Sequence, residues 1–473
     1  MIINAGTQFI NAVSLIKLPQ KANNISFKNM QKSPLTKEDY KRAQEYCEKR
    51  CAELKNADMW SHKHKLSLVN NFDLEKLNGL QYGIELFESN GRYDGMTMKE
   101  IAYTLGDLSV LLNRGCKNNC SHCYINALPK SKLSGTTSFT YEDFNKLLAG
   151  ISELKSRVEK NGIELVLPEI RTLFNDSDCI DVEISDKKGK KYDIVDCFDL
   201  IRQYPNIKTS GLFDTSGWNT CSEVHQKRGE KLVKYILDTY NDKRIKNKPV
   251  QTVLVSINPF HSLYQKYINL KNKRPEEASV YKDLYINRIA NTLYTFSPLL
   301  DVKDFKLTTN ITVLNSNPNY DDKVMNGLID EILSKLGKLY DTKGVSKELK
   351  EHYLEEYNNN MRKPLRISNA LFRPIEPYGR AKNIIPANEL IDTKEYGQQI
   401  KSLLLKPPYL NGAEKTVNPN GQIVILEKGL SFPTDIHLNL SQSNKSCPPL
   451  GEEIKGAIHP QDAEFKMSDT MYF

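Results

Sequence analysis

Two patterns of hydrophobic residues alternate along this chain. In residues 140–160, apolar side chains from Phe144 to Leu154 recur every three or four positions, and Thr140 precedes the acidic residues at the start. This spacing predicts an amphipathic helix with Thr140 as its N-cap. The same criteria predict helices at 36–57, 194–203, 222–240, 278–296, 322–337 and 346–357.

Short apolar runs rich in β-branched residues lie between most of these helices, at 108–112, 163–167, 207–213, 250–257, 305–314 and 365–372. A strand with its crossover helix needs about 30 residues or more, so six such units fit the observed spacing. The runs are almost entirely apolar, which is typical of parallel strands covered by helices. We therefore predict an α/β fold, a partial (β/α)6 TIM-like barrel with N-terminal and C-terminal extensions.

The flanking segments differ from this alternating region. We expect residues 1–99 to form a helical and mixed N-terminal extension and residues 100–382 to form the partial barrel. Residues 383–473 contain clusters of Pro and Asn and one predicted strand at 421–429, which indicates a C-terminal cap or tail.

Composition narrows the class of protein. Of 473 residues, 39% are hydrophobic, including 24 Tyr and 16 Phe, which excludes a collagen-like or wholly disordered chain. The net charge of +8 is spread among intermixed acidic and basic residues, which favours a solvated surface over a patch for an anionic partner. No run approaches the ~18 apolar residues of a membrane span, and the first residues lack a signal-peptide pattern. We expect a cytoplasmic protein with no membrane partner.

The cysteine pattern is the most informative feature. Cys116, Cys120 and Cys123 have the spacing C-x3-C-x2-C and directly follow the first predicted strand, at the edge where parallel sheets place active sites. Three thiolates can bind three irons of a four-iron cluster and leave the fourth iron open, because four Cys are the usual full set. Free thiols and a structural zinc site are the alternatives. Zinc requires a fourth ligand, for which His122 is poorly placed inside the same turn.

Residues 116–124, CKNNCSHCY, resemble the cluster loop of the radical S-adenosylmethionine (radical SAM) superfamily, with the signature C-x3-C-x-aromatic-C and His122 at the aromatic position. The resemblance covers about residues 108–380. It implies a [4Fe-4S] cluster on Cys116, Cys120 and Cys123, with S-adenosyl-L-methionine bound at the open iron. It further implies an electron donor such as flavodoxin or ferredoxin, and reductive cleavage of S-adenosylmethionine to a 5′-deoxyadenosyl radical that abstracts hydrogen from a substrate.

In that superfamily, polar turns after the later strands bind S-adenosylmethionine. We expect FNDSD, residues 174–178, to replace the usual Gly-Gly-Glu-like turn, with Glu169 in LPEIR as the competing site. FNDSD is also compatible with an ordinary Asx turn, and DTSGWN, residues 214–219, with a turn of no chemical importance. No catalytic residue is assigned, and His261 is interpreted as a structural histidine. The residues expected in the pocket are Tyr124, Asp176, Ser177, Asp178, Ser216, Ser256 and Asn258.

The substrate class is indicated by residues 372–383, FRPIEPYGRAKN. They resemble the segment after the last barrel strand in radical SAM enzymes that modify ribosomally synthesised peptides, although a plain Pro–Gly turn also explains PYGR. Such enzymes often carry a Cys-rich SPASM domain. Only Cys447 follows Arg380 here, which excludes a full one. We expect a peptide or protein substrate, with RNA or a small molecule as the alternative. The hypothesis from another class is a non-catalytic zinc- or cluster-binding interaction module.

Overall fold

The computed structural model describes residues 66–67, 108–123, 125–160, 164–165, 169–175, 178–209, 212–215, 222–311, 322–366, 379–384, 397–398, 401, 414–427 and 430–457. The strands are β1 (Leu66–Ser67), β2 (Leu108–Asn113), β3 (Glu164–Leu165), β4 (Glu169–Asn175), β5 (Glu183–Ser185), β6 (Lys191–Asp193), β7 (Lys208–Thr209), β8 (Leu212–Thr215), β9 (Thr252–Ile257), β10 (Lys306–Ile311), β11 (Glu414–Val417), β12 (Gln422–Glu427), β13 (Leu430–His437) and β14 (Glu452–Glu453). The α-helices are α6 (Tyr141–Lys160), α7 (Ile194–Arg202), α8 (Glu223–Asn241), α9 (Ser262–Leu270), α10 (Pro275–Phe296), α11 (Asp322–Thr342) and α12 (Lys347–Arg366). Short 3₁₀ turns are η4 (Lys130–Lys132), η5 (Cys179–Asp181), η6 (Ser297–Leu299) and η8 (Gly379–Asn383).

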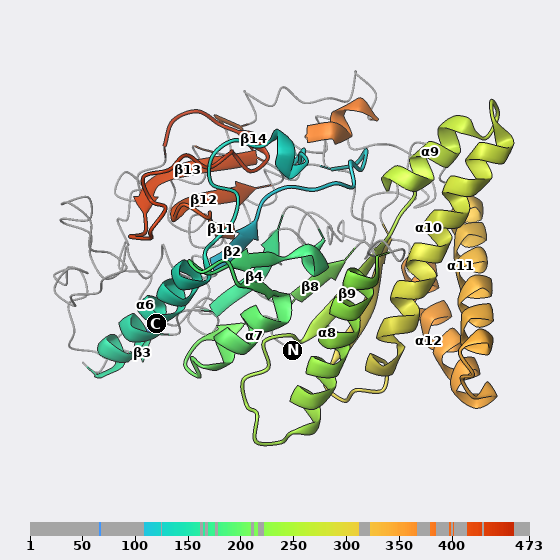
Figure 1. Ribbon diagram of the computed structural model, residues 1–473, viewed down its shortest axis with the longest axis horizontal. Coiled ribbons are helices and arrows are strands. Elements are labelled where there is room, and N and C mark those ends of the chain that lie inside the picture. Colours follow the sequence, from blue (N-terminus) through green and yellow to red (C-terminus); the bar gives the residue numbers. More distant parts are fainter. Residues whose placement is uncertain are drawn as a thin grey trace, which may run out of the picture.

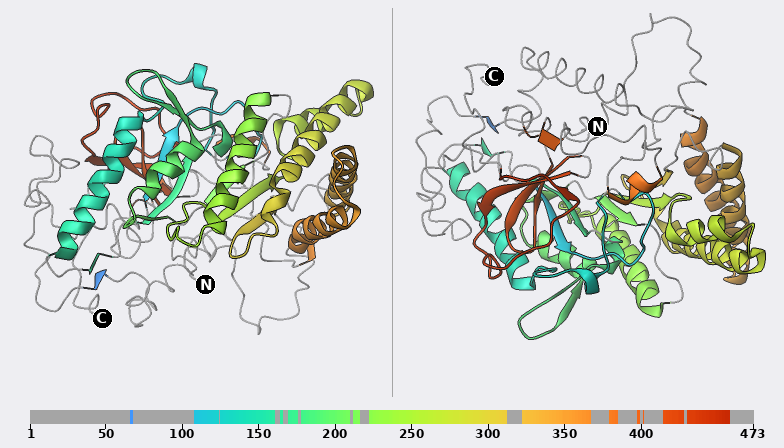
Figure 2. Two further views of the ribbon diagram at one scale, coloured as in Figure 1. Left: turned by 60° about the horizontal axis from the view of Figure 1, so that its bottom comes forward. Right: turned by 90° about the horizontal axis from the view of Figure 1, so that it is seen from above.

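The architecture is mixed α/β, as the sequence predicts, and its parallel strands follow one another in chain order (Figure 1). Strand β2 pairs with β4 and β4 with β7, while β8, β9 and β10 form a second parallel group beside β4. Helices α6, α7 and α8 lie along one side of these strands, and α11 and α12 stand beside α10 at one end (Figure 2). Within the described ranges no sheet closes into a barrel.

The second strand was predicted at the wrong position. Of the run at 163–167, the structure describes Glu164–Leu165, a short strand that pairs antiparallel with β1. The parallel strand is β4, which begins at Glu169. Pro168 separates the two runs and has no N–H for a ladder, so the strand starts after it. Glu169 therefore lies at the start of this strand, and its candidacy as a residue at the strand exit was wrong.

Within the predicted C-terminal cap or tail, the strands between residues 414 and 437 extend the sheet. Strand β11 pairs in parallel with β2 and antiparallel with β12, so β2 has a strand on each side. Only β12 was predicted, because Lys415 and Thr416 make β11 look polar, yet both are buried. The predicted helix 36–57 lies outside the described residues. So does all of the predicted strand 365–372 except its first two residues, which end α12.

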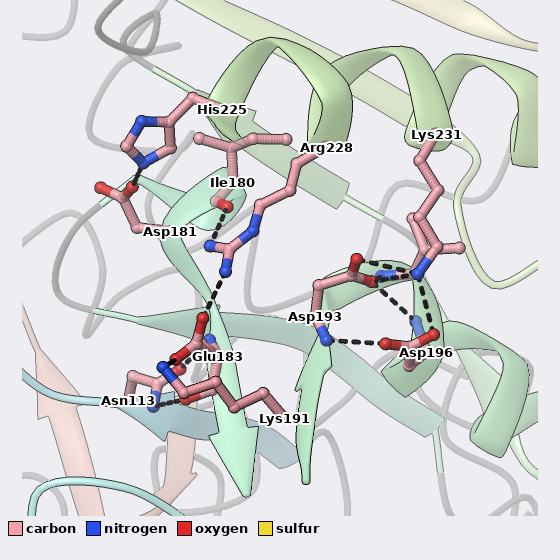
Figure 3. Close-up of polar contacts among 11 residues, drawn as sticks. Asn113, Ile180, Asp181, Glu183, Lys191, Asp193, Asp196, His225, Arg228 and Lys231 are labelled. Carbon is pink, nitrogen blue, oxygen red and sulfur yellow. Dashed lines mark hydrogen bonds and ion pairs between the residues drawn. The ribbon is translucent and has the colours of Figure 1, made fainter. Parts of the chain in front are cut away.

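A network of charged side chains connects α8 to the segment after β4 (Figure 3). Arg228 pairs with Glu183 on β5, and Lys231 bonds both Asp193, the N-cap of α7, and Asp196. The Asn113 amide at the end of β2 in turn bonds the backbone N–H and carbonyl of Glu183, at 2.9 and 2.8 Å. These contacts fix the end of β2, from which the cysteine loop departs. None of the helices in the described ranges is both long and apolar enough to pass through a lipid bilayer.

If β11 is an integral strand, Thr416→Pro destabilises the whole α/β unit. Thr416 has a strand on both sides, and losing its N–H orphans a buried acceptor, which costs about 1–3 kcal/mol in addition to any steric clash. Thr416→Val is the matched control, because the buried Oγ1 has no hydrogen-bond partner among the described residues. We expect urea unfolding to show a large loss for the proline variant and none for the valine variant. Equal stability of the two would contradict the pairing.

Candidate functional site

The cysteine loop, residues 114–128, begins two residues before its first thiol. Gly115 adopts φ 110°, and a Cβ there would lie 2.8 Å from the backbone of Lys130. Only glycine fits this close approach without strain. The Cys116 N–H then donates to the Leu128 carbonyl at 2.8 Å, which joins the two ends of the loop. The chain therefore leaves β2, turns over the carboxyl ends of the strands and returns.

Two of the three sulfurs accept a backbone N–H. Asn118 donates to Cys116 Sγ and Ala127 donates to Cys123 Sγ, both at 3.4 Å. At Cys120, the backbone N–H of Ser262, the first residue of α9, acts to lower the pKa of the thiol. None of the three thiols is in a disulfide. A backbone N–H that donates to sulfur favours the thiolate form, an effect that burial outweighs at Cys120.

The charges of the other two thiols affect the pKa of Cys120. The pKa of Cys120 is raised to about 12, mainly by burial and also by the negative charges of Cys116 and Cys123. The Ser262 N–H and the positive charge of Arg288 act in the opposite direction. The three sulfurs are therefore close enough to repel one another electrostatically, and a bound cation would relieve that repulsion.

Asn258, fully buried directly after β9, connects the strand end to the cysteine loop. Its backbone N–H and carbonyl both bond the Tyr285 hydroxyl, at 3.1 and 2.9 Å. Its side-chain Nδ2 lies 3.1 Å from Ser256 Oγ, 3.2 Å from His261 Nε2 and 3.5 Å from His122 Nε2. The side-chain amide of Asn258, which sequence analysis assigned to the nucleotide pocket, is thus hydrogen-bonded to other groups of this chain.

Both histidines beside Asn258 are uncharged near neutral pH. Burial lowers the pKa of His122 to about 4, and the positive charge of Arg380 also lowers it. Burial holds the pKa of His261 well below its usual range, with smaller contributions from His122 and Arg288. His261 is buried and hydrogen-bonded, which agrees with its interpretation as a structural histidine.

The loop is also held from α10. The Arg288 guanidinium donates from Nη1 and Nη2 to Asn118 Oδ1, each at 3.3 Å. A small cavity lies beside this contact, lined by Asn118, Cys120, His261, Ser262, Leu263, Tyr285 and Arg288. Arg288, Ser262 and Tyr285 were missed by sequence analysis. Only Ser262 had a signal, its place directly after the end of a predicted strand.

Asp178 lies after the end of β4, as predicted. Its Oδ1 accepts from the Ile180 N–H at 3.2 Å and its Oδ2 accepts from the Thr215 hydroxyl, at the end of β8, at 2.8 Å. Burial raises the pKa of Asp178, and the negative charge of Asp181 adds to the effect. The exits of β4 and β8 therefore meet at this carboxyl. Four other predicted pocket residues, Tyr124, Asp176, Ser177 and Ser216, lie outside the described residues.

The PYGR motif reaches the cysteine loop. The Arg380 N–H donates to the Cys123 carbonyl at 3.0 Å, and its side-chain Nε donates to the Cys120 carbonyl at 2.8 Å. Nη1 donates to the Ala127 carbonyl at 2.8 Å and to Asn126 Oδ1 at 3.2 Å. Nη2 is buried and has no hydrogen-bond partner among the described residues.

Within the described residues, no group of three or more His, Cys, Asp or Glu side chains is gathered closely enough to hold a metal ion. Comparison with known proteins adds no family: no protein-family model matches the chain, and neither curated proteins nor solved structures give a match. The chemistry of the site is therefore argued from the residues themselves.

The neutral state of His261 predicts an acid-sensitive fold. Below pH 6.5, the ordinary pKa of histidine, the unfolded chain takes up a proton at this residue and the folded protein does not. Stability is therefore lost as the pH falls, by about 1.4 kcal/mol per pH unit for this group. His261→Gln keeps an acceptor for Asn258 and removes the titration, so urea unfolding between pH 6.5 and 5 becomes correspondingly less pH-dependent. The surface variant His352→Gln is the control. An unchanged slope in His261→Gln would contradict the assignment.

Proposed function

We propose that this protein is a radical SAM enzyme, in which Cys116, Cys120 and Cys123 hold a [4Fe-4S] cluster that binds S-adenosylmethionine. The observation that carries the proposal is that the three cysteines stand on one loop at the carboxyl end of the parallel strand β2, where the sulfurs of Cys116 and Cys123 each accept a backbone N–H. Hydrogen bonds to the coordinating sulfurs are among the features that set the potential of iron–sulfur clusters.

The residues present fit such a group better than they fit a single metal ion. A lone zinc needs four ligands within about 2.3 Å of one point, and the described side chains provide no such gathering. In a cubic cluster each thiolate binds a different iron, so the sulfurs need not converge on one point. The buried Arg380 Nη2 also fits, because a negatively charged group at the loop offers it an acceptor.

When bound, the cluster and S-adenosylmethionine together supply a 5′-deoxyadenosyl radical for hydrogen abstraction. The residues of this chain have supporting tasks. Arg288 and the N-terminus of α9 place positive charge beside Cys120. His122 and His261 are neutral and contribute no positive charge. Asn258 couples the end of β9 to the loop.

We assign the partial (β/α)6 barrel as the scaffold, supported by the five parallel strands β2, β4, β8, β9 and β10 in chain order. We place the pocket for S-adenosylmethionine at the exits of these strands, on the side where Asp178 bonds Thr215 and Ser256 bonds Asn258. The substrate we favour is a ribosomally synthesised peptide, on the resemblance of residues 372–383, and the electron donor is a flavodoxin or ferredoxin in the cytoplasm.

Anaerobic reconstitution with iron and sulfide tests this proposal. The wild-type protein is expected to turn brown and to bind about four iron atoms per chain. After reduction with dithionite it is expected to convert S-adenosylmethionine to 5′-deoxyadenosine. Cys120→Ala loses both properties, whereas Cys197→Ala, a buried cysteine in α7, retains both.

Two results would refute the proposal or part of it. A colourless protein with one zinc per chain identifies a structural metal module instead. A brown protein that forms no 5′-deoxyadenosine identifies a cluster-binding scaffold. For the substrate, turnover stimulated by added peptide supports our preference, and turnover stimulated by RNA with a steep dependence on salt overturns it.

A further inference from the structure

The Arg380 side chain spans the second half of the cysteine loop. Its Nε and Nη1 donate to the carbonyl oxygens of Cys120 and Ala127, both at 2.8 Å, so one rigid guanidinium joins two points seven residues apart in the chain. Cys123 lies between these points, and its own carbonyl accepts the Arg380 backbone N–H. Three bonds from one residue therefore determine where the Cys123 thiol lies relative to the Cys120 thiol.

The loop needs this support because its own backbone is irregular there. Asn119 and Asn126 both adopt left-handed conformations, with φ 47° and 49°, and Asn126 also accepts from Arg380 Nη1. Positive φ is costly for residues other than glycine and persists where surrounding contacts enforce it. The turn that carries Arg380 is itself anchored, since Ala381 is fully buried.

Arg380 also places a fixed positive charge beside the loop, since its guanidinium bonds the carbonyl oxygens of Cys120 and Ala127. A positive charge favours the state of a neighbouring redox centre that has one more electron. A lysine would keep the charge, but it cannot reproduce the planar fork that reaches two carbonyls at once.

We propose that Arg380 is the positioning residue of the cysteine loop: it clamps the Cys120–Ala127 arm so that the thiols hold the spacing a cluster requires, and its charge raises the reduction potential of that cluster. The second part rests on the proposed function, whereas the clamp is a property of the iron-free chain.

The experiment compares Arg380→Lys and Arg380→Gln with the wild type. Arg362→Lys and Arg362→Gln are matched controls, because Arg362 is also partly buried and its guanidinium also bonds several groups, but on α11 and α12 rather than on the cysteine loop. In iron-free protein, alkylation of Cys120 and Cys123 is followed by mass spectrometry. Both Arg380 variants are expected to react faster than the wild type, and the Arg362 variants at the wild-type rate. Wild-type alkylation rates in both Arg380 variants overturn the clamp.

In reconstituted protein, loss of iron to a chelator and the reduction potential are measured. Both Arg380 variants are expected to lose iron about 10-fold faster, within the range for groups that support metal ligands. The potential becomes more negative in Arg380→Gln and stays near the wild-type value in Arg380→Lys, a separation that general loosening of the fold does not produce.

A wild type that binds no iron refutes the proposed function and leaves the clamp to the alkylation result. A wild type that binds iron, with both Arg380 variants unchanged in retention and potential, refutes the inference alone.

Discussion

Hydrogen bonds between the cysteine loop and distant segments of the chain are the constraint on which the site depends. The loop contains few apolar side chains, so packing alone cannot fix it. Ser121 instead donates its N–H to the Phe260 carbonyl at 3.0 Å, and Asn118 is bonded by Arg288. Each such bond contributes only about 1 kcal/mol net, and removing one leaves a partner unsatisfied at greater cost. The site therefore depends on all its anchors together.

Electrostatics and burial act against each other in this region. Three thiols lie near two arginines, yet the neighbouring imidazoles remain neutral because burial disfavours their charged form. The surroundings thus confine positive charge to the guanidinium groups, which cannot lose their protons. That arrangement favours an anionic group at the loop over a wide range of pH.

Helices and strands that are determined by nearby residues were predicted correctly from local patterns in the sequence. Phe144, Leu147 and Leu148 fix the buried face of α6, and the apolar run of β9 was placed within two residues. The second strand was misplaced because the apolar run before Pro168 matches the pattern of a strand. Proline has no backbone N–H, and the parallel strand β4 begins after it. Strand β11 was missed because Lys415 is 3% exposed, a burial that only its neighbours explain. Contacts such as Arg288 with Asn118 join residues 170 positions apart and have no local signal. Of the site, the cysteine spacing and the exits of β4 and β9 were foreseeable, and the supporting side chains were not.

The pairing of β11 with β2 has a consequence for biosynthesis. Strand β2 precedes the cysteine loop, yet its neighbour β11 is translated some three hundred residues later. The carbonyls of Pro448 and Pro449, which accept from the Arg114 side chain, are also translated more than three hundred residues after Arg114. Until β11 has left the ribosome, the nascent chain presents that side of β2 as an open edge, the kind of surface that recruits other strands. Assembly of the cysteine loop is thereby postponed until residues 414–449 have been translated.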